Sequence, residues 1–288
     1  MIVNSHESTA RSKVLGAELR RWRERAGIEA REVAHRLSWS RSKVSHMERG
    51  TRGVSELDAT KYLGVCRTPG ADIDDVLEFF HETEGLWAQL HPQLLSDELR
   101  GQITLETSAR EIHSLQLLVL PGLLQTEDYI RALITECGIA KEERIETLVR
   151  VRKDRQVLLR RHRPPAFRFF IHENPLRMMV GDAHTMNDQL LHLVFMSSRP
   201  HISIRVIPES VGVHANTVGP FTLMDYDLPR SVVSVDTLTT TLFIDRKRAV
   251  AGHRDALRQV ESIALDQGES RSWLANLANE FDRPREDS

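Results

Sequence analysis

Residues 38–50 read SWSRSKVSHMERG, and this short stretch decides the fold of the N-terminal part of the chain. A helix that begins after Ser40 turns Val44 and Met47 to one side, because residues three apart lie on the same helix face. The other side chains remain on outward or flanking positions: Arg41, Ser42, Lys43, Ser45, His46 and Arg49. Side chains of these types hydrogen-bond to DNA phosphates and base edges. The stretch therefore predicts a helix that can read DNA.

Two helices are predicted before this stretch. Apolar residues recur there at helical spacing in two groups: Leu15, Leu19, Trp22 and Ala26, then Ile28, Val33, Ala34 and Leu37. Gly27 lies between the groups, and glycine often ends a helix. Ser40 is suited to cap the next helix and to leave its first N–H groups facing a phosphate. Helix, turn and helix in this order are typical of DNA-binding proteins.

Two further helices are predicted after the stretch, so that five helices form one compact module. Gly50 and Gly53 interrupt the chain, and Ser55 with Asp58 is typical of the capped start of a fourth helix. The residues that we expect to face inward in the last two helices are Leu57, Tyr62 and Leu63, then Ile73, Val76, Leu77 and Phe80.

Three motifs in this module carry a family resemblance: LGAELRR at residues 15–21, WSRSKVS at 39–45 and ERG at 48–50. Together they resemble the lambda-repressor-like, or xenobiotic-response-element (XRE), regulators, in which the recognition helix reads the major groove. The resemblance implies DNA contacts by Ser40, Arg41, Ser42, Lys43, Ser45 and His46, with Arg49 and Arg52 on phosphates.

The chain departs from that family at the start of the first motif helix. The usual pattern there is a Thr cap followed by Gln, whereas this chain has Glu29-Ala30-Arg31, which lacks a good capping residue. We expect Arg31 to replace part of the lost DNA contact.

A second resemblance covers about residues 95–282. It rests on LPGLLQTEDY at 120–129, PESVGVH at 208–214 and GPFTL at 219–223. These segments resemble the large C-terminal domain, of poorly defined activity, in actinomycete-type helix-turn-helix regulators. The resemblance implies a domain that governs assembly, effector response or binding of a partner protein, and it supplies no catalytic residues.

Length and composition fit two folded domains. The chain has 288 residues, 40% hydrophobic and 28% charged, as in ordinary soluble globular proteins. This length leaves room for a second core. We expect a helix-turn-helix DNA-binding domain at residues 13–90 and a regulatory and dimerisation domain at 91–282. Flexible ends are expected at 1–12 and 283–288.

Charge is distributed unevenly between these parts. The whole chain has a formal net charge of -2, but residues 1–53 contain twelve Lys or Arg against six Asp or Glu. The N-terminal part therefore carries +6 and the remainder -8. A basic domain of this kind predicts salt-dependent binding to phosphates.

The C-terminal domain is predicted to be α+β with a mainly antiparallel sheet. Thr126 is suited to cap a helix whose inward residues end at Cys137, and Asn174-Pro175 is suited to start another. The strand candidates are 166–172, 202–207, 221–226, 232–236 and 240–244, of which the last three suit an antiparallel meander. Helices at about 246–266 and 270–281 could cover one sheet face or form a dimer interface.

The sequence contains no metal-protease helix, nucleophile turn, phosphate loop or dinucleotide fingerprint. We therefore expect no enzyme, cofactor or metal. His172-Glu173-Asn174 combines an imidazole and an acid, but a strand end followed by a capped helix explains it structurally. His184 and His192 are eight residues apart, too far for a usual pair of ligands on one helix.

Two segments keep alternative interpretations. Residues 208–219, with His214 and Asn216, could border an effector pocket or form a loop without a ligand. Residues 150–163 are rich in arginine and could contact DNA; a solvated helix face paired with Glu142, Glu143, Glu146 and Asp154 is the favoured interpretation.

No membrane segment is predicted, because the longest largely apolar stretch, residues 115–124, is about half the length of a membrane-spanning helix. The N-terminus shows no export pattern, so we expect a cytoplasmic protein. Cys66 and Cys137 are expected to be reduced and structural.

The main hypothesis is a homodimeric transcriptional regulator that binds double-stranded DNA at two half-sites through residues 40–49. Its C-terminal domain would respond to a small-molecule effector or a small regulatory partner protein. The alternative hypothesis is a sensor whose main activity lies in the C-terminal domain.

Overall fold

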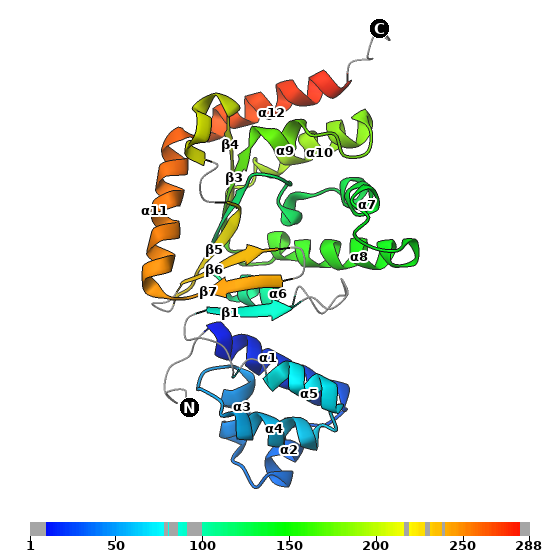
Figure 1. The fold of residues 1–288 in the computed structure, drawn as a ribbon, viewed down its shortest axis with the longest axis vertical. Coiled ribbons are helices and arrows are strands. Elements are labelled where there is room, and N and C mark those ends of the chain that lie inside the picture. The colour runs from blue at the N-terminus through cyan, green and yellow to red at the C-terminus, as the bar shows by residue number, and fades with distance from the viewer. Residues whose placement is uncertain are drawn as a thin grey trace.

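The computed structural model describes residues 10–77, 80, 86–90, 100–215, 219–227, 231–237 and 240–282. A helical part near the N-terminus lies against a larger part built on one sheet (Figure 1). Of the predicted flexible ends, 1–12 and 283–288, residues 1–9 and 283–288 lie outside the described residues, whereas residues 10–12 belong to the first helix. Asn216 of the predicted loop also lies outside the described residues.

The N-terminal part is a small helical bundle. Its described helices are α1 (Ala10–Arg25), α2 (Ala30–Arg36), α3 (Arg41–Glu48), α4 (Glu56–Val65) and α5 (Gly70–Leu77). They share one core in which Leu19, Val33, Val44 and Tyr62 are completely buried. The predicted inward orientation of Val44 and Met47 is confirmed.

Capping serines start α3 and α4 where the sequence predicts them. Ser40 Oγ accepts the Lys43 N–H at 3.1 Å, and Ser55 Oγ accepts the Asp58 N–H at 3.1 Å. The predicted inward position of Leu57 is wrong, because this side chain is 64% exposed. The cap at Ser55 sets a helix phase in which Ala59, Tyr62 and Leu63 face the core instead.

The C-terminal part is built on a seven-stranded sheet of order β1-β7-β6-β5-β2-β3-β4. The pairs among β5, β6 and β7 are antiparallel, as the predicted meander requires, whereas β2–β3 and β3–β4 are parallel. The strands are β1 (Leu86–Leu90), β2 (Glu111–Gln116), β3 (Ala166–His172), β4 (Ile202–Ile207), β5 (Phe221–Asp225), β6 (Ser231–Asp236) and β7 (Thr240–Ile244).

The prediction of a mainly antiparallel sheet is therefore wrong, since the sheet is mixed. The strand β2 was missed because its sequence, EIHSLQ, has only two apolar residues, three positions apart, and so shows neither an apolar run nor strict alternation. Two helical connections join the parallel strands, as such strands require. They consist of η2 (Gly122–Leu124), α7 (Glu127–Glu136), α8 (Glu142–Arg155) and η3 (Gln156–Arg160), then α9 (Glu173–Arg177) and α10 (Ala183–Met196).

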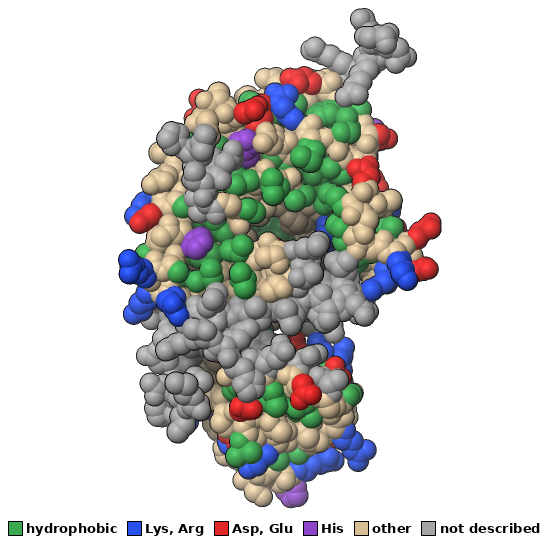
Figure 2. Space-filling view, viewed as in Figure 1, with side chains coloured by type: hydrophobic (Ala, Val, Ile, Leu, Met, Phe, Trp, Pro, Cys, Tyr) green, Lys and Arg blue, Asp and Glu red, His purple; other side chains and the backbone are tan. Residues whose placement is uncertain are grey.

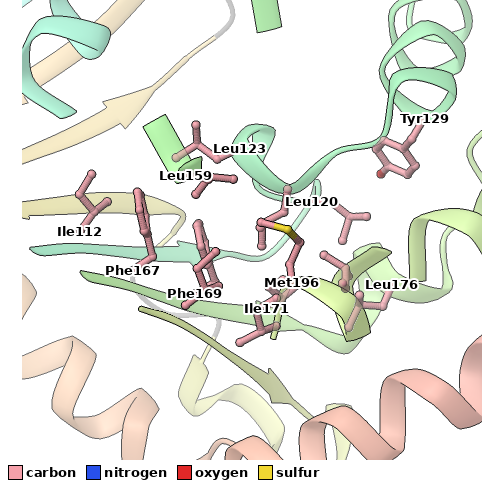
Figure 3. Packing of buried hydrophobic residues seen from close by; sticks show 14 of the residues in the cluster. Ile112, Leu120, Leu123, Tyr129, Leu159, Phe167, Phe169, Ile171, Leu176 and Met196 are labelled. Carbon is pink, nitrogen blue, oxygen red and sulfur yellow. The ribbon is translucent and has the colours of Figure 1, made fainter. Parts of the chain in front are cut away.

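Helices cover both faces of the sheet. On one face, α11 (Lys247–Ile263) packs over Leu115, Phe170 and Leu223. On the other, α12 (Gln267–Asp282) packs against α10 and β4, so the two C-terminal helices do not share a face (Figure 1). Figure 3 shows the core on this second face, where Phe167 and Phe169 point from β3 toward the helical connections.

The two parts of the molecule meet at the first turns of α1. Val14 is buried among the apolar residues of the C-terminal core, and α1 contacts α6 (Arg100–Ser108). Lys13 Nζ lies 4.8 Å from the centre of the Tyr226 ring, a cation–π distance. The helix α1 therefore belongs to both cores.

The two cysteines differ. Cys66 is buried, and burial raises the pKa of its thiol to about 11. Cys137 is exposed at the end of α7, so its predicted inward position is wrong.

No helix in the described ranges has the length and apolar character that a membrane crossing needs.

A buried ion pair fastens α8 to α6. Arg155 donates from Nε to Glu106 Oε2 at 2.8 Å, and the Glu106 side chain is only 1% exposed. Replacing Arg155 by Ala leaves this carboxylate buried without a counter-charge, so we expect a loss of about 3–5 kcal/mol of unfolding free energy. Urea denaturation followed by circular dichroism measures it.

The matched control is Arg150→Ala, on the same helix, because Arg150 is exposed and takes part in no ion pair within the described residues. We expect this control to change the unfolding free energy by less than about 0.5 kcal/mol. Equal losses for the two variants would contradict a structural role of the Glu106–Arg155 pair.

Candidate nucleic-acid interface

The orientation of α3 is fixed by the carboxylate of Glu48 at its last turn. Arg23 of α1 donates to it twice, from Nε at 2.7 Å and from Nη2 at 3.0 Å. The Tyr62 hydroxyl of α4 donates to the same carboxylate at 2.6 Å. Burial and the Glu48 hydrogen bond raise the pKa of Tyr62 well above its ordinary value, so its hydroxyl keeps its proton. One carboxylate thus joins three helices, and we call Glu48 with its donors Arg23 and Tyr62 the Glu48 clamp.

A close backbone approach adds a second restraint. Gly50 has a φ of +58°, and a Cβ there would lie 2.3 Å from the Ser12 carbonyl oxygen. A Cβ on Gly16 would lie 2.4 Å from the Met47 carbonyl oxygen. Ser12 Oγ donates to the Gly50 carbonyl at 2.9 Å. The end of α3 therefore packs directly on the α1 backbone, which only glycine permits at these two positions.

Several predicted site residues form an exposed stripe along α3. Arg41, Ser45 and Arg49 are spaced by four residues and so lie on one helix face. Arg41, Ser42 and Arg49 are exposed, Ser45 is half-buried, and Arg52 is exposed just beyond the helix. Arg49 donates from Nε to the Ser45 carbonyl at 3.1 Å, which holds its guanidinium along the helix. Arg41 is in no ion pair among the described residues.

Other predicted site residues make local contacts instead. Lys43 Nζ lies 2.9 Å from Asp58 Oδ2 and 3.9 Å from the centre of the Trp39 ring. His46 Nδ1 and Thr51 Oγ1 are 2.7 Å apart. The chain thus brings Lys43 and His46 into contacts within the domain, while Arg41 and Ser42 remain open.

The first motif helix begins as its unusual sequence suggests. Glu29 occupies the N-cap position of α2 but makes no side-chain capping hydrogen bond. Its carboxylate lies 2.7 Å from Arg31 Nε instead. Arg31 is exposed at the start of α2, although its charge is shared with Glu29. The turn that follows α2 places Ser38 at a φ of +53°, a conformation that non-glycine residues adopt rarely.

Sequence reasoning missed the residues that position this surface. The Glu48 clamp was missed because Arg23 and Tyr62 lie 25 and 14 residues away from Glu48 in the chain. The sequence feature that could have revealed the clamp is the ERG motif at residues 48–50, because Glu48 lies there on the inner side of a helix rich in basic residues. Trp39, as the platform under Lys43, gave no comparable signal.

Two family models match the chain. One, described as a helix-turn-helix domain, matches residues 14–76, which cover most of α1, all of α2–α4 and nearly all of α5. The other, described as domain of unknown function DUF5753, matches residues 99–276. The chain belongs to the DUF5753 family. The resemblance to XRE-like regulators with a large C-terminal domain is confirmed by this pair of domains. No curated protein matches the chain.

The DUF5753 domain contains one group with metal-ligand chemistry among the described residues. Ligand atoms of Glu111, His113 and Asp225 lie within 4.8 Å of one another. Arg168 pairs with Glu111 at 2.8 Å, and Arg254 binds Asp225 through both terminal nitrogens. Burial alone would raise the pKa of Asp225, but its hydrogen-bond partners hold that pKa well below the ordinary value. Guanidinium groups therefore already neutralise both carboxylates.

The His172-Glu173-Asn174 segment of the DUF5753 domain is a helix start. His172 is buried and its Nδ1 accepts the Asn174 N–H at 3.1 Å. Glu173 accepts from the Glu209 N–H at 2.9 Å and pairs with Arg177. These contacts support the structural interpretation of the segment.

The close approach at Gly50 can be tested against a glycine of similar conformation. Gly27 also has a positive φ, +67°, but nothing lies within 4 Å of its virtual Cβ. We expect Gly27→Ala to cost about 1–2 kcal/mol, the strain of the left-handed region alone. Gly50→Ala should cost a further 1–3 kcal/mol or so, because α1 and α3 must separate.

Thermal unfolding of the full chain, with hydrogen exchange at α3 amides, measures this difference. Loss of α3 protection in Gly50→Ala and its retention in Gly27→Ala is the expected result. Identical protection in both variants would show that the contact with Ser12 does not hold α3.

Proposed function

We propose that this protein is a sequence-specific DNA-binding transcriptional regulator that reads DNA through α3. The observation that carries the proposal is the exposed face of Arg41, Ser42 and Arg49 on a helix held in place by the Glu48 clamp. A fixed helix with open arginine and serine side chains suits base edges in the major groove. The net charge of +6 over residues 1–53 supports attraction to phosphates.

The residues would divide their roles by position. Arg41, Ser42 and Ser45 would face base edges, and Ser40 would place the start of α3 near a phosphate. Arg31, Arg49 and Arg52 would contact the backbone, and Lys43 and His46 would reach DNA by exchanging their partners within the domain.

We further propose that the protein acts as a homodimer. One eight-residue recognition helix spans few base pairs, and two copies can read half-sites about 34 Å apart. The DUF5753 domain would supply the contacts between copies. We expect sedimentation velocity at micromolar concentration to give twice the chain mass, both for the full chain and with a single palindromic duplex. A monomer in both cases would contradict this assembly.

Regulation would come from the DUF5753 domain, through a small molecule or a partner protein. A cavity of about 510 Å³ lies over the face of β3 and β4, lined in part by Arg168, Ser203, Arg205 and Glu261. This volume is within the usual range for small-molecule sites. The alternative, a sensor whose main activity lies in this domain, rests on the same cavity and predicts ligand binding without a change in DNA affinity.

DNA reading is tested with Arg41→Ala and Arg49→Ala on a duplex selected from a random pool and on random duplex. If Arg41 contacts a base, its loss should weaken the selected duplex by about 1–3 kcal/mol and leave random duplex nearly unchanged. Loss of Arg49 should weaken both duplexes evenly and reduce the salt slope by about one.

Fluorescence anisotropy across a salt series measures both effects. Lys61→Ala is the control, because Lys61 is an exposed cation on α4 and is not one of the proposed DNA contacts. Equal effects of the Arg41 and Arg49 variants on both duplexes would contradict the division of roles. Absence of any duplex binding at low salt would contradict the proposed function itself.

A further inference from the structure

The DUF5753 domain exposes large apolar side chains beside its helical connections. Leu191 and Phe195, one turn apart on α10, are 47% and 61% exposed. Val157 in η3 is 61% exposed. Single exposed apolar residues are common, but several on one surface indicate a binding site.

A hydrogen bond and a shared core link η3 to the chain at the end of α10. Leu159 of η3 accepts a hydrogen bond from His201 Nε2 at 3.0 Å, just after α10. The inward neighbours of the exposed residues, including Leu158 and Met196, belong to one core cluster. Figure 1 shows α8 and α10 on the side of the sheet opposite α11, and Figure 2, in the same view, shows apolar side chains exposed over the region of α9 and α10.

Three cations lie near the turn of α10 that carries Leu191 and Phe195. His192, next to Leu191, has its pKa lowered by burial and then by the charges of Lys153, Arg160 and Arg199. All three cations are therefore near this turn of α10. The Arg199 guanidinium also lies 5.7 Å from the centre of the Phe195 ring.

None of the three cations has an ion-pair partner among the residues that the structure describes. Two other arginines of the helical connections are paired: Arg131 with Glu127 and Glu146, and Arg155 with Glu106. For residues 150–163, a solvated helix face paired with Glu142, Glu143, Glu146 and Asp154 was the favoured interpretation. The described contacts contain no ion pair between these groups, although the hydrogen bond from Arg131 and then the charge of Arg150 help to lower the pKa of Glu146. Three cations without ion pairs therefore lie near one turn of α10, and one of them, Arg199, lies beside the exposed Phe195 ring.

We propose that this surface binds an acidic segment of a partner protein that carries at least one large apolar side chain. The α10–η3 surface, as we name it, consists of Lys153, Val157, Arg160, Leu191, Phe195 and Arg199. Carboxylates of the partner would pair with the open cations, and its apolar residue would cover Phe195 and Val157. Aromatic and arginine side chains are the residues that most often contribute strongly to protein interfaces.

Charge and apolar area together favour this partner over two others. A DNA backbone would meet the cations but leave Phe195, Val157 and Leu191 in water. A second copy related by a two-fold axis would place this surface against itself, and its cations would repel. The proposal is independent of DNA binding by α3.

The experiment is selection of peptides from a displayed random library on the full chain without DNA, with counter-selection on Phe195→Asp. We expect enriched peptides that combine Asp or Glu with Leu, Phe or Trp. Their affinity, measured by fluorescence anisotropy, should fall at least about tenfold in Phe195→Asp and in Arg160→Glu. It should also weaken as salt rises.

Two controls match these variants in exposure and charge. Met178→Asp changes another exposed apolar residue of the same domain, 54% exposed, and Lys247→Glu reverses an exposed cation on α11. Both should keep full peptide affinity and, with the test variants, an unchanged circular dichroism spectrum.

Three outcomes would overturn the proposal. They are the absence of enriched peptides, enrichment of peptides without acidic residues, and equal loss of affinity in test and control variants. Reduced binding of duplex DNA by Arg160→Glu, without enriched peptides, would assign the cations to DNA. Failure of DNA binding by α3 would leave the peptide result unaffected, so the two proposals fail separately.

Discussion

The hydrogen bonds that Arg23 and Tyr62 donate to the Glu48 carboxylate are the constraint on which the DNA-binding part depends. The Arg23 and Glu48 side chains are only 12% and 10% exposed, so the pair is largely shielded from water and salt. Removing either partner would leave a charge with little solvent, which costs far more than a surface ion pair. The clamp acts at the last turn of α3, which leaves the first turns of that helix free to face a ligand.

The same constraint reaches the larger domain through α1. Ser12 bonds the Gly50 carbonyl at the end of α3, while the next two residues, Lys13 and Val14, contact Tyr226 and the C-terminal core. Consecutive residues on one helix therefore touch both domains. A change in the DUF5753 domain that moves α1 must also move Gly50, because the contact there is between backbones and has no flexible side chain to absorb it.

Local patterns in the sequence predicted the parts of the fold that depend on neighbouring residues. The serine caps, the inward Val44 and Met47 and the β5–β6–β7 meander all follow from spacing within one or two elements. The parallel pairing of β2 with β3 depends on a match between Glu111 and Ala166 across 55 residues, and no local pattern encodes it. At the candidate site, the outward side chains were predictable from helix phase, but the partner of Lys43 was not. Asp58 was predicted only as part of the capped start of α4, but its carboxylate also pairs with Lys43 of α3.

The distribution of paired and open charges links the two proposed surfaces. Within the described residues, most arginines of the DUF5753 domain are used internally, as in Arg155 with Glu106 or Arg254 with Asp225. A charge with a fixed partner stabilises the fold but has less to offer a ligand, because binding must first break the pair. Three of the cations without such a partner, Lys153, Arg160 and Arg199, lie on the α10–η3 surface, and Arg41 also takes part in no ion pair within the described residues. Because no internal pair has to be broken first, these cations are free to pair with an acidic partner, or with a phosphate at α3.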